Sequence, residues 1–281
     1  MGYRFLALDI DGTLVSTVDA ISPSVREAIA RAAEAGLEVI LATGRRYSRA
    51  LPFSKILQIE TPLVTSSGAL TKIPKTHETL FRARFSDEVL RKTLIVLREL
   101  GFPAAMLGDT FSHGFDYYIE RPNGYRNPYF EDYLEQNSGS ERIWDDFLAE
   151  LPPEIFATFT VGSEAEMKWV ESQLHAALPH QLTTNVLRSP RYRGFFCEIM
   201  PAGTTKWSAI CQLAAQRGVT PREICAVGDD VNDISMIREA GFGVAMGNAP
   251  DEVKKAAHWV APPQEEDGLV AVIERLLEES S

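Results

Sequence analysis

Two carboxylates separated by one residue follow a short apolar run near the start of the chain. The segment reads Asp9-Ile10-Asp11-Gly12-Thr13. Successive side chains of a strand point to opposite faces, but the glycine permits a sharp turn that can bring both carboxylates toward one ligand. Such a pair could hold a metal ion or perform acid and base catalysis. It also fits a solvated turn, a helix cap or the metal-nucleotide site of some glycosyltransferases, so the pair alone is ambiguous.

A second acidic segment lies far along the chain. Gly228-Asp229-Asp230-Val231-Asn232-Asp233 holds three carboxylates and an amide within five residues. Carboxylates this close repel one another strongly unless a cation lies among them. The spacing does not match an EF-hand loop, because Val231 breaks the alternation of acids. The segment indicates a metal site, with a solvated acidic loop as the alternative.

Two further segments could bind an anion. Thr43-Gly44-Arg45 offers a hydroxyl and unobstructed backbone N–H groups ahead of an expected helix, which suits a phosphate group. A simple helix N-cap would look the same. Lys206 lies at the start of another expected helix and is unremarkable by itself. The inference of phosphate chemistry therefore depends on the ordered set of four segments and not on any one of them.

Strands must position these segments. Apolar runs at residues 4–8, 37–42, 62–66 and 223–227 predict buried parallel strands, and three of the runs end at a segment described above. The N-cap and proline at Ser22-Pro23 predict the start of a helix. Because strands alternate with helices, we expect an α/β fold with a Rossmann-like parallel sheet, whose site lies at the carboxyl ends of the strands.

The pattern changes over residues 85–191. This stretch predicts helices at 86–101 and 164–178, strands at 155–161 and 182–187, and an aromatic-rich segment over 102–135. It reads as a self-contained α+β block. The first pattern returns after about residue 200. We therefore expect a discontinuous catalytic core of residues 1–84 and 192–281, with an inserted α+β cap domain of residues 85–191 between the two parts.

Composition narrows the class of protein. The 281 residues are 45% hydrophobic and 24% charged, as in ordinary globular proteins. The formal charge of −11 disfavours a nucleic-acid partner. No signal-peptide pattern or membrane-length apolar run is present, so we expect a cytoplasmic protein without a membrane partner. The cysteines form no CxxC pair and read as reduced thiols: Cys197, Cys211 and Cys225.

In their order along the chain, the four segments resemble the motifs of the haloacid dehalogenase superfamily of phosphatases, and most of all its Cof-type branch, which has an inserted α/β cap. Motif one spans residues 9–14, motif two is Thr43-Gly44-Arg45, motif three is Lys206 and motif four spans residues 228–233. The resemblance covers the whole chain. It implies a Mg²⁺-dependent phosphatase that hydrolyses a small phosphorylated metabolite, such as a sugar phosphate, through a phospho-aspartate intermediate.

The resemblance also implies roles for single residues. Asp9 would be the nucleophile and a metal ligand. Asp11 would be the general acid and base, with its backbone carbonyl on the metal. Asp229 would be the third protein ligand of the metal, and Asp233 would orient Lys206 or a water. Lys206 would be catalytic and would bind the phosphoryl group together with the remaining motif residues: Thr43, Gly44, Arg45 and Asn232.

Two positions depart from the family pattern. Ser67 stands where related proteins usually carry asparagine, and Trp207 follows Lys206 where glycine is common. A phosphomutase or phosphotransferase of the same superfamily is the alternative function, whereas a non-catalytic sensor would need a missing catalytic residue. The expected cap contains polar side chains that could contact substrate or could simply belong to its core and surface: His113, Arg121, Tyr125, Arg126 and Tyr129.

Overall fold

The computed structural model describes residues 2–16, 19–120, 127–188 and 191–280. The chain divides into two compact units. Met1–Phe81 and Thr205–Ser281 form one, here called the core unit, and Arg82–Thr204 form the other, here called the inserted unit. The mixed α/β fold class with an inserted part is as predicted. The two units divide at other positions than the expected 84/85 and 191/192, and strand β11 (Phe195–Pro201) pairs with strands of the inserted unit.

The core unit is built on a parallel sheet of five strands in the order β14-β13-β12-β1-β2. Strand β1 lies between β2 and β12, and its backbone is completely buried on both sides. Short apolar strands of this kind are typical of parallel sheets that helices cover on both faces. The strands span β1 (Phe5–Leu8), β2 (Glu38–Leu41), β12 (Ile224–Gly228), β13 (Phe242–Ala245) and β14 (Trp259–Val260).

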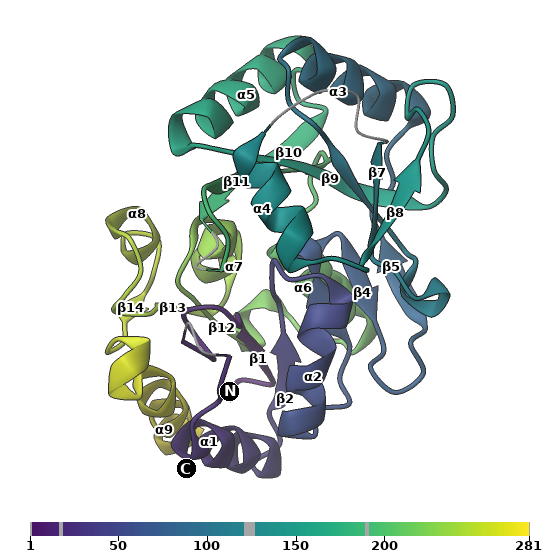
Figure 1. The fold of residues 1–281 in the computed structure, drawn as a ribbon. Helices are drawn as coiled ribbons and strands as arrows, with labels where there is room; N and C mark the ends of the chain where they lie inside the picture. The colour runs from purple at the N-terminus through teal and green to yellow at the C-terminus, as the bar shows by residue number, and fades with distance from the viewer. Residues whose placement is uncertain (1, 17–18, 121–126, 189–190, 281) are drawn as a thin grey trace. The chain divides into compact units, whose positions relative to one another are not determined.

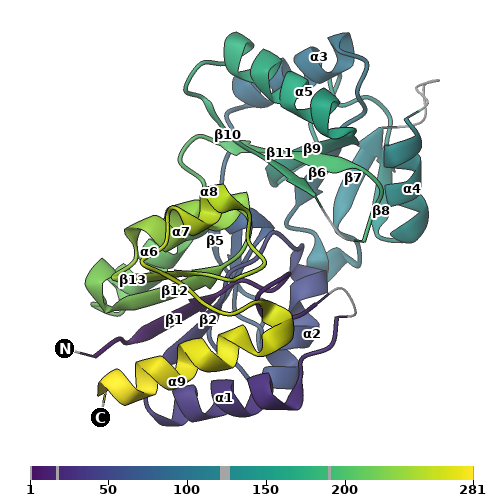
Figure 2. The ribbon, with the colours of Figure 1, turned by 90° about the vertical axis from the view of Figure 1, so that its left-hand side faces the viewer.

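Helices cover this sheet on both faces. Figure 2 shows α1 and α9 side by side on one face, with α6 and α7 on the other. The predicted start of α1 is confirmed, since the Ser22 hydroxyl accepts a hydrogen bond from Val25 N at 3.2 Å. The helices of the core unit are α1 (Pro23–Glu34), α2 (Tyr47–Leu57), α6 (Lys206–Gln216), α7 (Ile234–Glu239), α8 (Asp251–Lys254) and α9 (Gly268–Ser280), with 3₁₀ turns at Pro221–Glu223, Val231–Asp233 and Gln264–Glu266.

A small sheet of three strands extends the core unit beside β2. It contains β3 (Leu63–Thr65), β4 (Leu70–Lys72) and β5 (Thr79–Arg82), in that order. A parallel bridge between Ala42 and Val64 joins its first strand to the segment that follows β2. The turn between β3 and β4 is a 3₁₀ turn over Ser66–Gly68. It lies beside the segment that follows β2, because Ser67 N donates to Thr43 O at 3.0 Å.

The inserted unit contains a sheet of six strands in the order β10-β11-β9-β6-β7-β8, antiparallel except for β7 with β8. Figure 1 shows α3 and α5 on one face and α4 on the other. Its remaining elements span α3 (Asp87–Glu99), β6 (Ala105–Gly108), a 3₁₀ turn (Phe111–His113), β7 (Tyr117–Glu120), α4 (Pro128–Gln136), β8 (Glu141–Trp144), β9 (Ile155–Gly162), α5 (Glu164–Ala177) and β10 (Leu182–Arg188).

The two faces of this second sheet differ in composition. Under α3 and α5 the core is mostly aliphatic, with Leu94 and Leu174 among its buried residues. Against α4 it is aromatic, and the ring of Tyr133 lies 5.0 Å from that of Phe159 and 4.9 Å from that of Tyr192.

Within the described ranges, no helix has the length and apolar character that crossing a bilayer requires.

Candidate active site

The two acidic segments meet at one edge of the core sheet. Strands β1 and β12 are parallel neighbours, with Leu8 opposite Val227. The chain direction therefore places both segments at the carboxyl ends of adjacent strands, where sites of parallel sheets occur. The backbone N–H of Asp9 extends this pairing by donating to Val227 O at 3.0 Å.

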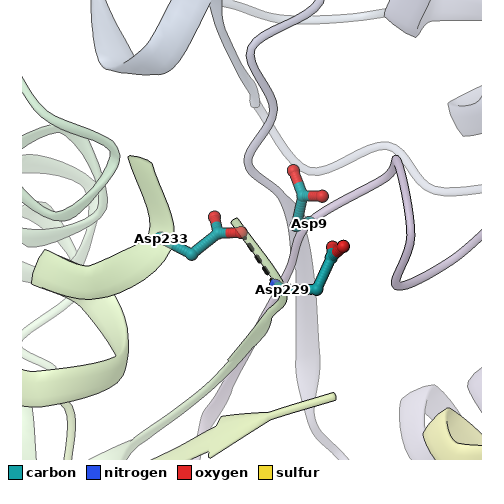
Figure 3. A group of neighbouring side chains, drawn as sticks. All are labelled: Asp9, Asp229 and Asp233. Atoms are coloured by element: carbon teal, nitrogen blue, oxygen red, sulfur yellow. Dashed lines mark hydrogen bonds between the residues drawn. The ribbon is translucent and has the colours of Figure 1, made fainter. Parts of the chain in front are cut away.

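Three carboxylates form a compact group at this edge. Asp9, Asp229 and Asp233 each offer an oxygen, and these three atoms lie within 4.8 Å of one another. Figure 3 shows Asp9 and Asp229 leaving the two strand ends and Asp233 approaching from the turn that follows β12. The Asp233 carboxylate accepts hydrogen bonds from the backbone N–H groups of Asp229 and Asp230, both at 3.0 Å. Its orientation is thus set by the loop that carries Asp229.

Lys206 supplies the positive charge of this group. Its ammonium donates to Asp9 Oδ1 and to Asp233 Oδ1, both at 2.6 Å, and its side chain is 1% exposed. The lysine is the first residue of α6, whose N-cap Thr205 accepts a hydrogen bond from Ser208 N. Gly68 lets the β3–β4 turn approach this cap, because a Cβ there would lie 2.1 Å from the Thr205 carbonyl oxygen.

The charges of this group perturb one another. Burial raises the pKa of Asp9 to about 8, even though the Lys206 ammonium opposes the shift. Burial likewise raises the pKa of Asp229 well above its ordinary value, with the neighbouring carboxylates adding to the shift. Burial disfavours the charged form of Lys206, but Asp233 and Asp9 outweigh it and raise the pKa of the ammonium. When no metal ion is bound, the single positive charge of Lys206 therefore does not balance the negative charges of the three carboxylates.

A divalent metal fits this deficit. With all groups ionised, three carboxylates and one ammonium leave two negative charges in a buried space. The donors are oxygen atoms, which Mg²⁺ prefers over softer ligands. The residues at this edge therefore match a hard divalent cation in both charge and ligand type, as the sequence predicts.

Asp229 is held from two sides. The Thr13 hydroxyl donates to Asp229 Oδ1 at 3.1 Å, and Asn248 Nδ2 donates to Asp229 Oδ2 at 3.1 Å and to Gly12 O at 3.0 Å. Gly12 has φ +78°, and a Cβ there would lie 2.0 Å from Asp229 Oδ2. Asn248 was not among the residues predicted from the sequence. Its position in the loop after β13, which ends at the same edge, is the signal that could have identified it.

The Arg45 guanidinium binds Asp11. Arg45 Nε donates to Asp11 Oδ2 at 2.7 Å and Nη2 to Asp11 Oδ1 at 2.5 Å, and Nη2 also lies 2.6 Å from Asp19 Oδ1. The sequence predicted a phosphate contact for Arg45 and gave no signal for Asp19. The group of three carboxylates does not include the Asp11 side chain.

Thr43 and Gly44 lie between β2 and α2. Thr43 is not the cap of that helix, because the N-cap is Arg46. The Thr43 hydroxyl instead accepts a hydrogen bond from Arg45 N at 3.1 Å, and Thr43 N donates to Val64 O at 2.9 Å. The helix-cap alternative for the threonine is therefore wrong. Its hydroxyl instead stabilises the turn over residues 43–45 that joins β2 to α2.

Asn232 contacts the position at which this chain departs from the family pattern. Its Nδ2 donates to Ser67 Oγ at 3.1 Å. Ser67 has φ +54° and is buried, so the loop after β3 holds its hydroxyl in a fixed place facing motif four. Trp207, the other departure, is buried in the hydrophobic cluster that packs α6 on the sheet.

The predicted residues of the inserted unit give less information. Arg121, Tyr125 and Arg126 lie outside the described residues. His113 is exposed at the end of a 3₁₀ turn, and Tyr129 is half-buried in the first turn of α4. The cysteines form no disulfide; two are buried and Cys211 is half-buried.

Known proteins resemble this chain over nearly its full length. A family model described as haloacid dehalogenase-like hydrolase matches residues 6–273. Pyridoxal phosphate phosphatase YbhA of Escherichia coli (strain K12) is 31% identical, over 97% of this chain and 98% of the relative. 5-Amino-6-(5-phospho-D-ribitylamino)uracil phosphatase YcsE of Bacillus subtilis (strain 168) is 24% identical, over 96% and 94%. A haloacid dehalogenase-like hydrolase from Bacteroides thetaiotaomicron superposes with a TM-score of 0.77 at 30% identity, covering 98% of this chain and 99% of that one.

Proposed function

The chain belongs to the haloacid dehalogenase-like hydrolase family and is a phosphoric monoester hydrolase; on this basis we propose that it is a Mg²⁺-dependent phosphatase of small phosphorylated metabolites, with a phospho-aspartate intermediate on Asp9. One observation carries the proposal. The Asp9 carboxylate pairs with the buried ammonium of Lys206 and lies beside Asp229, at the edge of the sheet where the parallel strands have their carboxyl ends. This arrangement suits a nucleophile that must approach an anionic phosphate.

In the first step, an Asp9 oxygen attacks phosphorus, and the bond between phosphorus and the leaving oxygen breaks. Two anions do not approach each other without nearby positive charge, and Lys206 supplies part of it from 2.6 Å away. For this step Asp11, which is accessible to solvent, must first take up a proton from water, and it then gives that proton to the leaving alkoxide. This transfer turns a poor leaving group into a neutral alcohol.

In the second step, a water attacks the phosphorus of phospho-Asp9. Asp11 takes the proton of that water, the bond between phosphorus and Asp9 breaks, and inorganic phosphate leaves. One carboxyl group thus serves as acid and then as base, and the difficult hydrolysis is divided into two easier displacements. The exposure of Asp11, whose side chain is 36% accessible, suits proton exchange with solvent.

Asp9 and Asp229 side chains and the Asp11 carbonyl would hold Mg²⁺, with Asp233 supporting Lys206 and the Asp229 loop. When bound, the ion would neutralise charge on the transferring phosphoryl group and on the carboxylates. We assign phosphoryl binding to Lys206, the Thr43 hydroxyl, the Gly44 backbone and Asn232. We assign Arg45 to Asp11 instead of phosphate, because its fork is bonded to that carboxylate.

The substrate class is a sugar phosphate or a similar phosphometabolite, selected by the inserted unit. The activities of the relatives support a small substrate, since one is a pyridoxal phosphate phosphatase and another is a 5-amino-6-(5-phospho-D-ribitylamino)uracil phosphatase. Selection by the inserted unit would follow the usual division in which one part performs chemistry and another contacts the leaving group.

A screen of phosphorylated metabolites with free-phosphate detection tests the proposal. We expect Mg²⁺-dependent release of phosphate that EDTA stops, and we expect Asp9→Asn to lower kcat by at least about 10³-fold without loss of the fold, because an amide is a poor phosphoryl acceptor. Turnover that persists in pure Asp9→Asn would contradict the mechanism. An isomeric phosphate that accumulates without free phosphate would instead support a phosphomutase.

A further inference from the structure

One guanidinium in the core unit is bonded to two carboxylates at once. Arg45 Nη2 contacts both Asp11 Oδ1 and Asp19 Oδ1, while Nε contacts Asp11 Oδ2. The arginine side chain is 8% exposed, whereas the two carboxylates are each 36% exposed. The ring of Phe53 lies under the guanidinium, 4.7 Å from Cζ to the ring centroid. The plane of the guanidinium is therefore defined by an aromatic face and two anionic partners.

Asp19 lies outside the four motifs. Asp19 belongs to the segment between β1 and α1, whereas Arg45 lies in the segment that follows β2. Their hydrogen bond therefore connects two loops that follow neighbouring strands of the core sheet. Its backbone has φ +56°, in the left-handed region that aspartate and asparagine tolerate better than most residues. This conformation and the 2.6 Å contact together place its carboxylate on the guanidinium.

We propose that Asp19 is a positioning residue for catalysis, which acts through Arg45 to fix the orientation of the Asp11 carboxyl group. The inference rests on the proposed function, in which Asp11 transfers the proton. A carboxyl group on a half-exposed loop has several rotamers of similar energy, and a bidentate fork selects one of them. The fork itself needs a fixed orientation, and Asp19 supplies a second point of attachment at the same Nη2 atom.

This role predicts a loss that depends on the leaving group. An alkoxide must be protonated as it departs, so its reaction is sensitive to the placement of Asp11, whereas nitrophenolate leaves without a proton. A small misplacement of a reacting group lowers rate substantially. Loss of the Asp19 carboxylate should therefore lower kcat/KM about five- to tenfold for an alkyl phosphate and less than about twofold for para-nitrophenyl phosphate.

Two substitutions remove the carboxylate while suiting the backbone. Asp19→Asn keeps the shape of the side chain, and Asp19→Gly removes the side chain where a positive φ costs glycine nothing. Asp267→Asn is the matched control, because Asp267 also has a positive φ of 55° and accepts a hydrogen bond from the Ser24 hydroxyl at 2.7 Å. The control should leave both substrates unaffected.

The experiment measures kcat/KM for para-nitrophenyl phosphate and for the best alkyl phosphate of the metabolite screen. It uses wild type, both Asp19 variants, Asp267→Asn, Arg45→Met and the double variant Asp19→Asn with Arg45→Met. We expect the ratio of alkyl to aryl activity to fall about five- to tenfold in both Asp19 variants and not in the control. Since Asp19 acts through Arg45, Asp19→Asn should add nothing to Arg45→Met.

An unchanged ratio, an equal fall for both substrates, or a full effect of Asp19→Asn in the Arg45→Met background would each overturn the role of Asp19. The proposed function fails in a different way. In that case wild type would show no Mg²⁺-dependent phosphate release, or Asp9→Asn would retain it, whatever happens at residue 19.

Discussion

The core unit holds two groups in which one cation lies between two carboxylates, and they differ in exposure. Lys206 lies between Asp9 and Asp233, with side chains 1%, 5% and 0% exposed. In the second group Arg45 lies between Asp11 and Asp19, whose side chains are both 36% exposed. Both are anchored at the carboxyl ends of core strands, so the position of the strand ends does not account for the difference in exposure.

The contrast separates two kinds of chemistry. A buried ammonium acts in a low dielectric, where its attraction for a phosphoryl group is strong, but removal of either partner leaves an unpaired buried charge. A half-exposed carboxyl group can exchange protons with water, and the planar fork of arginine fixes its orientation without enclosing it. We assign charge neutralisation to the first group and proton transfer to the second.

Removal of the buried cation should have the largest effect. Lys206→Met leaves the Asp9 and Asp233 carboxylates without their partner, so we expect a loss of about 3–5 kcal/mol in the free energy of unfolding and a fall of at least about 10³-fold in kcat. Chemical denaturation and steady-state kinetics measure the two effects. Lys75→Met is the control, since Lys75 pairs with Glu60 at a side-chain exposure of 70%. Wild-type activity in Lys206→Met would break the proposed division of roles.

The pH dependence of metal binding tests the charge of the buried group. Burial raises the pKa of Asp9 to about 8, so a proton must leave that carboxyl group for Mg²⁺ to bind at lower pH. We expect affinity to rise by at least about tenfold per pH unit below pH 8, because burial also raises the pKa of Asp229, the other proposed carboxylate ligand. Isothermal titration calorimetry measures it. Affinity that is flat across this range would contradict the shift.

The same shift bears on stability. The folded metal-free protein holds the Asp9 proton up to about pH 8, whereas the ordinary value of 3.8 applies after unfolding. The folded state therefore binds more protons between these values, and the contribution of Asp9 to stability falls as pH rises through this window. Added Mg²⁺ should raise the midpoint of thermal unfolding more at pH 8 than at pH 6.

Replacement of the fork by a point charge should have a smaller effect. Arg45→Lys keeps one positive charge near Asp11 but loses the two parallel hydrogen bonds. We expect about a tenfold lower kcat/KM for alkyl phosphates, with Mg²⁺ affinity unchanged because the metal group lies at Asp9 and Asp229. A large loss of Mg²⁺ affinity in this variant would show that the two groups are coupled.

An effect on metal affinity alone is expected at Asn248, which contacts a proposed metal ligand from outside the three-carboxylate group. Asn248→Ala removes the hydrogen bond to Asp229 Oδ2 and should lower Mg²⁺ affinity about tenfold, the low end for residues that orient metal ligands. Asn185→Ala, in the inserted unit, is the control, because that amide contacts Glu198 instead. Isothermal titration calorimetry near pH 8, close to the pKa of Asp9, measures the Mg²⁺ affinity of both variants. Equal affinities in the two variants would contradict a role of Asn248 in the site.

Local signals in the sequence were sufficient for much of the fold. Strands β1 and β12 are short and wholly apolar, β2 is apolar after Glu38, and α1 begins at the predicted cap and proline. The sequence did not predict strands β6, β7 and β8, each of which has only 4 residues and therefore shows little periodicity. The expected boundary at 191/192 placed the whole of strand β11 in the core, since only its pairing with β9 and β10 makes it a strand of the inserted unit.

The sequence by itself determined which reactive residue types stand at the ends of strands, because an apolar run followed by Asp-x-Asp-Gly or by Gly-Asp-Asp is visible without coordinates. Tertiary structure decided which of them meet. Lys206 is 197 positions from Asp9 in the chain, and Asn248 is 19 from Asp229, yet each pair is bonded. The sequence predicted a phosphate contact for Arg45, but in the structure its guanidinium donates to the carboxylates of Asp11 and Asp19. Such choices depend on strand order and loop conformation, which follow from burial of the whole sheet and not from any local run of residues.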